Sequence, residues 1–442
     1  MLKELMMFLF FVPVTISAQF SIQGLFSPAE SYNYVLIYQV TPNAHNYVGN
    51  AEIKNGKFHF ELDSTNPKGI YKLVYALPQE DYNFDIIYSA EEDIEFSFDQ
   101  ETGVRFVKSS ENMLVSSYTR DMNMVNQEID AYFSKSKSLD RVILRNLFSK
   151  KIEIQDIYEN NAIETIALSF IKSSKSYVPD SYTTLDDYYK NLKRDYFIHV
   201  DFSDVYLQSS NFLIDRISHY IFENDDVKTS DMLKYQNRVD DVYVALKKAK
   251  VNTKIALLFQ LWQQMVDFGL DATANHISNR YLLNLLNNHG NSELAGLLKN
   301  FQNISLGSIA PDFFWQQSNE DTGSKITLKS LNVAKRYIIV FWSSSCSHCQ
   351  EEIPELRRFL ESKSEEKIQV IAVGLEETSF NWSNLILDYP NFIHVLGLGK
   401  WTNEIALKYN VSGTPTYFIL NEDKEIILKP DSLDELKEYF RY

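Results

Sequence analysis

The chain has 442 residues, of which 45% are hydrophobic and 23% are charged, with 14 Gly and 11 Pro. This composition excludes collagen-like, low-complexity and disordered chains, and at roughly 150 residues per domain the length predicts about three domains. Lys and Arg total 43 against 59 Asp and Glu, a formal net charge of −16. Because such a chain repels nucleic acids and anionic lipids, neither is an expected partner.

Residues 1–18 have the layout of a secretory signal peptide. Lys3 precedes an apolar run from Leu5 to Ile16, and Ser17-Ala18 follow as small residues before the expected cut. An uncleaved membrane anchor is the alternative, but the run is shorter than the roughly 20 residues that span a bilayer. The sequence therefore predicts export to the periplasm.

Residues 19–110 are predicted to form an antiparallel β domain of the sandwich type. Polar and apolar residues alternate in 34–38, 57–61 and 94–98, a period of two that is typical of strands. Asn55-Gly56 lies between two such segments. Both residues tolerate the positive φ that a type I′ turn requires, so we expect a β-hairpin there.

Residues 111–300 are predicted to form an all-α domain. One helix is indicated by helical spacing of apolar residues between Ile255 and Val266, with Asn252 as its cap and Gly269 as its stop. Further helices are expected at 112–130, 159–172, 185–195, 205–222, 230–248, 271–288 and 291–300. No catalytic pattern stands out in this region.

Residues 301–442 alternate strands with helices, which predicts an α/β domain. Segments 338–341 and 368–373 are apolar on both faces, as in buried parallel strands. Segments 417–420 and 425–428 are expected to form a closing antiparallel pair, and 432–440 a terminal helix. The order is βαβ followed by ββα.

Cys346 and Cys349 are the only cysteines of the chain. They lie too close in sequence to brace a fold of this size, so we expect a chemical role. The C-x-x-C spacing also occurs in half of a zinc site, but the eight histidines are scattered without paired ligand spacing. We therefore expect neither a metal nor a cofactor.

The two cysteines fall where the first buried strand meets a helix. At a helix N-terminus the backbone N–H groups and the helix dipole stabilise a thiolate, which makes Cys346 the expected nucleophile. Cys349, in the first turn, is expected to be more buried and to resolve a mixed disulfide. His348 lies between them, and an imidazole there can stabilise the thiolate.

Residues 306–442 resemble a thioredoxin-fold domain of the TlpA/ResA-like thiol-disulfide oxidoreductase family. The resemblance is carried, in this order, by 307–313, by Phe341-Trp342 followed by Cys-Ser-His-Cys, by Glu352-Ile353-Pro354 and by 411–416. The chain departs from the family at Ser345, where relatives usually have Trp. Upstream, the β and helical regions resemble extra modules that precede envelope redoxins, and we expect substrate-presenting or assembly surfaces there.

The resemblance implies roles for individual residues. Pro415 would follow a cis peptide bond beside the cysteines, with Thr414 offering backbone hydrogen bonds to an extended substrate. A buried acid would exchange a proton with Cys349, and of the candidates Glu376 and Glu377 spacing favours Glu377. A solvated loop charge is the competing account for that carboxylate. Substrate contacts are further expected at Trp342, Ser347 and His348.

The implied activity is disulfide exchange with protein thiols and disulfides, most simply as a reductant that a membrane electron-transfer partner recycles. A peroxiredoxin is not expected, because its Pro-x-x-x-Thr-x-x-Cys run would need Pro and Thr where positions 339 and 343 hold Ile and Ser. The remaining alternative is a non-catalytic envelope binding protein with a vestigial dithiol. Loss of activity on Cys346→Ser separates the two hypotheses.

Overall fold

The computed structural model describes residues 20–63, 65–79, 81–135, 140–180, 183–222, 231–316, 325–363 and 366–441. The predicted leader and its cleavage position lie outside these residues. The chain divides into two compact units, 1–225 with 238–257 and 226–237 with 258–442. Within the described ranges, no helix combines the length and the apolar character that crossing a bilayer requires.

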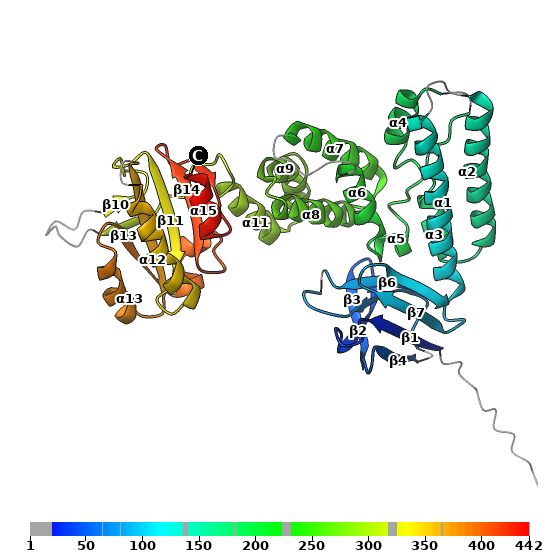
Figure 1. Ribbon diagram of the computed structural model, residues 1–442, viewed down its shortest axis with the longest axis horizontal. Helices are drawn as coiled ribbons and strands as arrows, with labels where there is room; N and C mark the ends of the chain where they lie inside the picture. Colours follow the sequence, from blue (N-terminus) through cyan, green and yellow to red (C-terminus); the bar gives the residue numbers. More distant parts are fainter. Residues whose placement is uncertain are drawn as a thin grey trace, which may run out of the picture. The chain divides into compact units, whose positions relative to one another are not determined.

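The first unit begins with eight strands, drawn in blue to cyan in Figure 1. They are β1 (Phe20–Ser27), β2 (Tyr34–Thr41), β3 (Ala44–Glu52), β4 (Lys57–Leu62), β5 (Gly69–Val74), β6 (Asn83–Tyr88), β7 (Ile94–Asp99) and β8 (Gly103–Lys108). Two four-stranded sheets result, with the orders β4-β1-β7-β8 and β3-β2-β5-β6. Their buried side chains form one core, with Ile22 and Phe96 from the first sheet and Ile37 and Tyr71 from the second.

The predicted β-rich region is thus present, but it is not purely antiparallel. Strand β1 pairs with β7 in parallel, with Ile22 opposite Ile94. The alternation of apolar residues fixes which face of a strand is buried and carries no information on strand direction. A parallel partner that lies about 70 residues away has no local signal.

The turn at Asn55-Gly56 was predicted correctly, whereas the pairing of its two flanking strands with each other was not. Asn55 has φ 52° and Gly56 has φ 76°, and Lys54 and Lys57 exchange backbone hydrogen bonds of 2.8 and 3.0 Å across them. The flanking strands then separate, because β3 pairs with β2 while β4 pairs with β1. The turn therefore transfers the chain from one sheet to the other.

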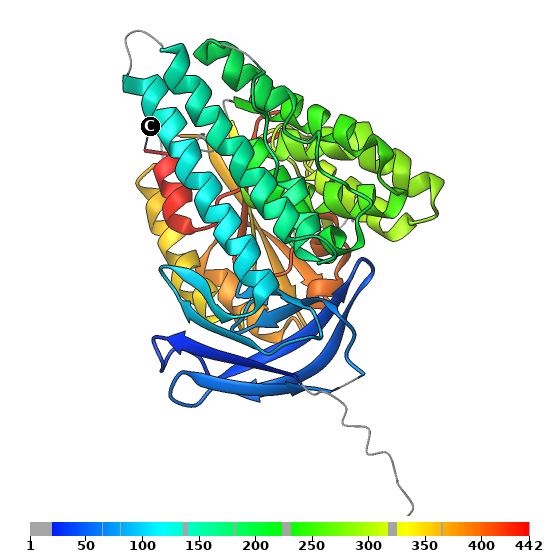
Figure 2. The same ribbon diagram turned by 90° about the vertical axis from the view of Figure 1, so that its right-hand side faces the viewer.

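The helices that follow are shown in cyan to green in Figures 1 and 2, where α1 and α2 run side by side. Their bounds are α1 (Ser110–Lys135), α2 (Arg141–Asn161), α3 (Ala167–Ser173), α4 (Leu185–Arg194), α5 (Val205–Gln208), α6 (Phe212–Phe222), α7 (Met232–Ala245), α8 (Val251–Asp267), α9 (Asp271–Ile277), α10 (Leu283–Asn288) and α11 (Ser292–Asn303). A π-helical turn, Ser278–Leu282, joins α9 to α10.

Several helix predictions need correction. The long helix α2 was missed, and the segment predicted as a helix over 159–172 contains its end, a turn and α3. The helix expected over 205–222 is broken, because the hydroxyls of Ser209 and Ser210 bond to backbone carbonyls of α5 and so compete with the helical ladder. Asn252 lies inside α8 rather than at its cap. Gly269 does end that helix, with φ 67°.

A buried charge cluster joins the strands of the first unit to its helices. The Lys72 ammonium lies 2.7 Å from a carboxylate oxygen of Asp85 and 2.8 Å from the amide oxygen of Asn83. It also contacts the amide oxygen of Asn211, the residue before α6, at 3.1 Å. Lys72 is 7% exposed, so the ion pair is held away from water and fixes the strand β5 against the start of α6.

The C-terminal part of the second unit is a five-stranded sheet with helices on both faces. Its elements are β9 (Phe314–Gln316), β10 (Lys325–Thr327), β11 (Arg336–Trp342), α12 (Ser347–Glu361), β12 (Ile368–Glu376), α13 (Phe380–Leu385), β13 (Ile393–Leu398), α14 (Glu404–Lys408), β14 (Thr416–Asn421), β15 (Ile426–Leu428) and α15 (Leu433–Tyr439). The sheet order is β13-β12-β11-β14-β15. In this order β13, β12 and β11 are parallel to one another, whereas β14 is antiparallel to both β11 and β15. The parallel strands β11 and β12 and the antiparallel pair β14 and β15 were predicted, whereas β13 was not.

Side-chain alternation along β11 divides this core into two layers. Ile338, Val340 and Trp342 face α12 and α15. Tyr337 and its alternate neighbours face the opposite layer, which includes Phe313 and the residues of α14. The central strand is buried on both faces, and it delivers the cysteine segment to the end of the sheet where α12 begins.

Candidate active site

Cys346 lies at the junction of a buried strand and a helix. Strand β11 ends at Trp342 and α12 begins at Ser347, which makes Cys346 the N-cap residue. Its sulfur accepts a hydrogen bond from the Cys349 backbone N–H at 3.3 Å and, as a thiol, donates to the carbonyl oxygen of Thr414, also at 3.3 Å. Both cysteines are free thiols, with Cys346 partly exposed and Cys349 fully buried. The predicted helix position and order of burial are therefore present.

The pKa values of the two thiols are shifted in opposite directions. Partial burial raises the pKa of Cys346, but hydrogen bonds with the Cys349 and Thr414 side chains and with the backbone N–H groups of Cys349 and His348 outweigh it and lower the pKa below 9.0. Desolvation is the main cause that raises the pKa of Cys349 to about 12, and the hydrogen bond and charge of Cys346 add to it. Cys346 is therefore the sulfur that ionises first.

The loop opposite the cysteines has the predicted backbone geometry. The Thr414-Pro415 peptide bond is cis, and both residues are half-buried. Immediately after them β14 begins, and the Thr416 hydroxyl donates to the carbonyl oxygen of Gly413 at 2.8 Å. The loop thus presents the Thr414 carbonyl directly to the Cys346 sulfur.

The buried carboxylate at the end of β12 belongs to Glu376, and the expectation for Glu377 was wrong. Glu376 is 4% exposed, whereas Glu377 is exposed. Side chains alternate along a strand, so Glu376, the last residue of β12, shares the α12-facing side with Ala372. Its two carboxylate oxygens accept hydrogen bonds from the Ser344 backbone N–H at 2.5 Å and from the Ser344 hydroxyl at 2.9 Å. Glu376 therefore holds the segment that leads into Cys346.

Trp342 is also placed differently from its predicted role as a substrate contact. It is 2% exposed and packs in the same core cluster as Cys349, with its ring edge-on to Tyr389. Its position on the α12-facing side of β11 buries it. Ser347 and His348 are exposed beside Cys346, so these two residues remain available to a partner.

A carboxylate and a phenol next to the cysteines were not predicted as site residues. The Tyr417 hydroxyl donates to Glu352 at 2.8 Å. Burial is the main cause that raises the pKa of Tyr417, and the bond to Glu352 and the charges of Cys349 and Cys346 add to it. Tyr417 packs in the same core cluster as Cys349. Glu352 follows Cys349 by three residues on α12, which puts both on one helix face. That spacing was the signal in the sequence, whereas the contact with Tyr417 joins distant segments.

The described part of the chain contains no group of three or more His, Cys, Asp and Glu side chains arranged to hold a metal ion. The C-x-x-C pair would supply two thiolates, whereas a structural zinc site takes four ligands. His348, the nearest imidazole in sequence, is exposed.

The C-terminal region is similar in sequence to known proteins. The sequence model of the AhpC/TSA family matches residues 306–429. A thiol-disulfide oxidoreductase ResA of Bacillus cereus is 27% identical over 134 residues, which cover 30% of this chain and 74% of the relative. A second ResA, from another Bacillus cereus strain, is 26% identical over 150 residues, which cover 33% and 83%. The sporulation thiol-disulfide oxidoreductase A of Bacillus subtilis is 26% identical over 113 residues, which cover 24% and 68%.

Two solved structures are also similar. A thioredoxin-like protein of Bacteroides caccae aligns with a TM-score of 0.34 at 16% identity, covering 61% of this chain and 98% of that one. The thioredoxin domain of a Bacteroides vulgatus thiol-disulfide oxidoreductase aligns with a TM-score of 0.27 at 22% identity, covering 31% and 95%. The sequence matches are the informative ones, and by them residues 306–429 form a thioredoxin-like domain of the AhpC/TSA family, homologous to the ResA thiol-disulfide oxidoreductases.

Proposed function

We propose that this protein is an exported thiol-disulfide oxidoreductase that exchanges disulfides with protein substrates through Cys346 and Cys349, in the direction of reduction. One observation carries the proposal. A partly exposed thiol with a lowered pKa caps a helix, and a fully buried thiol with a pKa of about 12 lies three residues further along that helix. This is the asymmetry that a nucleophile and a resolving thiol require.

The reaction proceeds in two exchanges. The Cys346 thiolate attacks one sulfur of the substrate disulfide, the substrate S–S bond breaks, and the second substrate sulfur leaves as a thiolate that takes a proton from solvent. Cys349 then attacks the Cys346 sulfur, the mixed disulfide breaks, and the substrate is released with both sulfurs reduced. The two electrons come from the dithiol, which ends as a Cys346–Cys349 disulfide.

The second exchange needs a base. Burial raises the pKa of Cys349, so this thiol carries its proton near pH 7 and must lose it to attack. We infer that Glu352 takes this proton, because it shares a helix face with Cys349 and its carboxylate is held by Tyr417, which packs in the same core cluster as Cys349. Glu376, bonded twice to Ser344, keeps the segment before Cys346 in place.

The substrate surface proposed here consists of the exposed Ser347 and His348 and the loop of Thr414 and Pro415 beside the Cys346 sulfur. A membrane electron-transfer partner is proposed to reduce the oxidised pair again, since catalysis of reduction requires a source of two electrons. For the upstream parts we propose a β-sandwich over 19–110, a helical domain over 111–300 and substrate-presenting surfaces on both, after removal of residues 1–18.

Reduction of insulin disulfides by dithiothreitol, followed as turbidity, tests the proposal. We expect the wild-type protein to accelerate the reaction and Cys346→Ser to abolish the acceleration. Incubated with insulin in the absence of dithiothreitol, reduced Cys349→Ser should instead accumulate a mixed disulfide, visible on a non-reducing gel and released by reducing agent. Equal turbidity curves for wild type and Cys346→Ser would contradict the proposal and favour a non-catalytic binding protein.

A further inference from the structure

The helices of the first unit enclose a pocket that the proposed redox reaction does not use. It has a volume of about 500 Å³ and is lined by residues of α1, α2, α4, α6 and α7 and of the segments on either side of α4. A second cavity of about 350 Å³ shares Met122, Lys151, Ser176 and Tyr177 with it. Both volumes are typical of small-molecule sites.

Positive charge dominates the lining of this pocket. The lining includes four cationic side chains, those of Lys151, Lys193, Arg216 and Arg238, and one carboxylate, that of Asp130. Asp130 is exposed, and a tyrosine hydroxyl donates to it at 2.7 Å. The chain as a whole has a net charge of −16, so this local excess of cations runs against its composition. Such a lining attracts an anion.

Lys151 is the buried cation of the pocket, with 2% of its surface exposed. Among the described residues, its ammonium has one hydrogen-bond partner, the Tyr188 hydroxyl at 3.4 Å. An ammonium carries three donors, so two N–H groups lack an acceptor in a site shielded from water. Desolvation lowers the pKa of Lys151 to about 8, and the charge of Asp130 opposes this shift. An incoming carboxylate would supply the missing acceptors and the missing charge.

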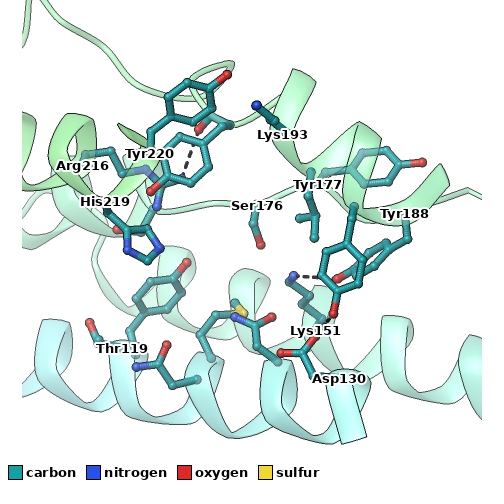
Figure 3. A pocket seen from close by; sticks show the side chains of 18 of the residues that line it. Thr119, Asp130, Lys151, Ser176, Tyr177, Tyr188, Lys193, Arg216, His219 and Tyr220 are labelled. Carbon is teal, nitrogen blue, oxygen red and sulfur yellow. Dashed lines mark hydrogen bonds between the residues drawn. The ribbon is translucent and has the colours of Figure 1, made fainter. Parts of the chain in front are cut away.

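Two more polar atoms in the lining are buried without a hydrogen-bond partner in the part of the chain that the structure describes. They are the hydroxyl of Ser176 and the Nε of Arg216. Figure 3 shows Ser176 between the Lys151 side of the pocket and the side formed by Arg216 on α6. Buried polar atoms are normally satisfied, so these atoms too indicate a ligand that is polar at one end.

Aromatic rings form most of the remaining wall. Six tyrosines line the pocket: Tyr118, Tyr177, Tyr188, Tyr189, Tyr196 and Tyr220. Tyrosine rings bind flat apolar bodies and keep a hydroxyl for hydrogen bonding. We propose that this pocket binds a small aromatic carboxylate, with its carboxylate on Lys151 and its ring among the tyrosines.

Calorimetric titration of the full chain with two matched probes tests the proposal without any variant. The probes are 2-naphthoate and its uncharged analogue 2-naphthamide, which share the ring system. We expect saturable binding of naphthoate that is at least about tenfold tighter than that of naphthamide, because a charge-assisted bond to a buried ammonium is lost in the amide. Equal affinities, or no saturable binding of naphthoate up to about 1 mM, would overturn the proposal.

Two variants locate the anion. Lys151→Met should weaken naphthoate binding at least about tenfold, to the level of naphthamide, with an unchanged far-UV circular dichroism spectrum. Lys150→Met removes the same charge from the next residue of α2, whose side chain is 48% exposed and pairs with Glu128 at 2.7 Å, and should leave the affinity unchanged. If Lys151→Met binds naphthoate as tightly as wild type, the assignment to Lys151 is wrong.

Discussion

Replacing Lys151 by Met is expected to stabilise the fold, although it removes a hydrogen bond. Burial lowers the pKa of this lysine from 10.5 to about 8, and each pKa unit corresponds to about 1.4 kcal/mol. The protonated side chain therefore destabilises the folded state by about 3 kcal/mol at pH 7. With 2% exposure there is little solvent to screen this effect. Methionine fills a similar unbranched volume without charge, so the variant should recover most of that free energy.

The pH dependence of this stabilisation has a definite sign. The unfolded lysine keeps its proton up to about pH 10.5, whereas the folded one loses it above about pH 8. Between these values the unfolded state binds more protons, so wild-type stability rises with pH across this window relative to the Met variant. The gap in unfolding free energy should be about 3 kcal/mol at pH 7 and should vanish near pH 10.5.

Urea unfolding of both proteins, followed by circular dichroism at several pH values, measures this gap. Lys150→Met is the matched control and should stay within about 0.5 kcal/mol of wild type. A Lys151→Met variant that is less stable than wild type at pH 7 would refute the reasoning. So would a gap that does not change between pH 7 and pH 10.5.

Three further substitutions test the site and the fold. In stopped-flow reaction with dithiodipyridine, Glu352→Gln should leave the first thiopyridone release unchanged and slow the second release, in which Cys349 attacks Cys346, about 100-fold. The control Glu351→Gln, at an exposed residue, should slow neither release. Equal slowing of both releases would contradict a role of Glu352 as base. Glu376→Ala leaves two buried donors without an acceptor and should lower the unfolding free energy by about 2–4 kcal/mol, whereas Glu377→Ala should change it by no more than about 0.5 kcal/mol; equal losses would be inconsistent with the geometry. Lys72→Met leaves the half-buried Asp85 carboxylate without its cation and should lower the unfolding free energy by about 3 kcal/mol, and an unchanged urea midpoint would show that the pair is not structural.

The parts of the site that are local in sequence could be predicted from it. The strand-to-helix junction at Cys346 and the burial of Cys349 follow from two short patterns and the properties of a helix N-terminus. The choice between Glu376 and Glu377 depended on where β12 ends, and an error of one residue reverses the face. Trp342 was misjudged for the same reason, since its face of β11 is the one that α12 covers.

The parts that depend on contacts between distant segments could not be predicted. Nothing in the periodicity of β1 indicates a parallel partner in β7, because strand alternation is the same in either direction. Helix α2 was missed because it has few buried residues, among them Leu144 and Phe148, and so shows a weak apolar stripe. The pocket around Lys151 combines side chains from helices that are far apart in sequence, so no sequence motif indicates it.

Alkylation of the reduced wild-type protein with iodoacetamide, measured against pH and resolved for each cysteine by mass spectrometry of peptides, tests the central claim most directly. We predict that the rate at Cys346 reaches its half-maximum below pH 9.0, because its thiolate is stabilised at the start of α12. Cys349, with a pKa of about 12, should stay unmodified over the same range. A half-maximum for Cys346 at or above pH 9.0, or modification of Cys349 before Cys346, would contradict the account.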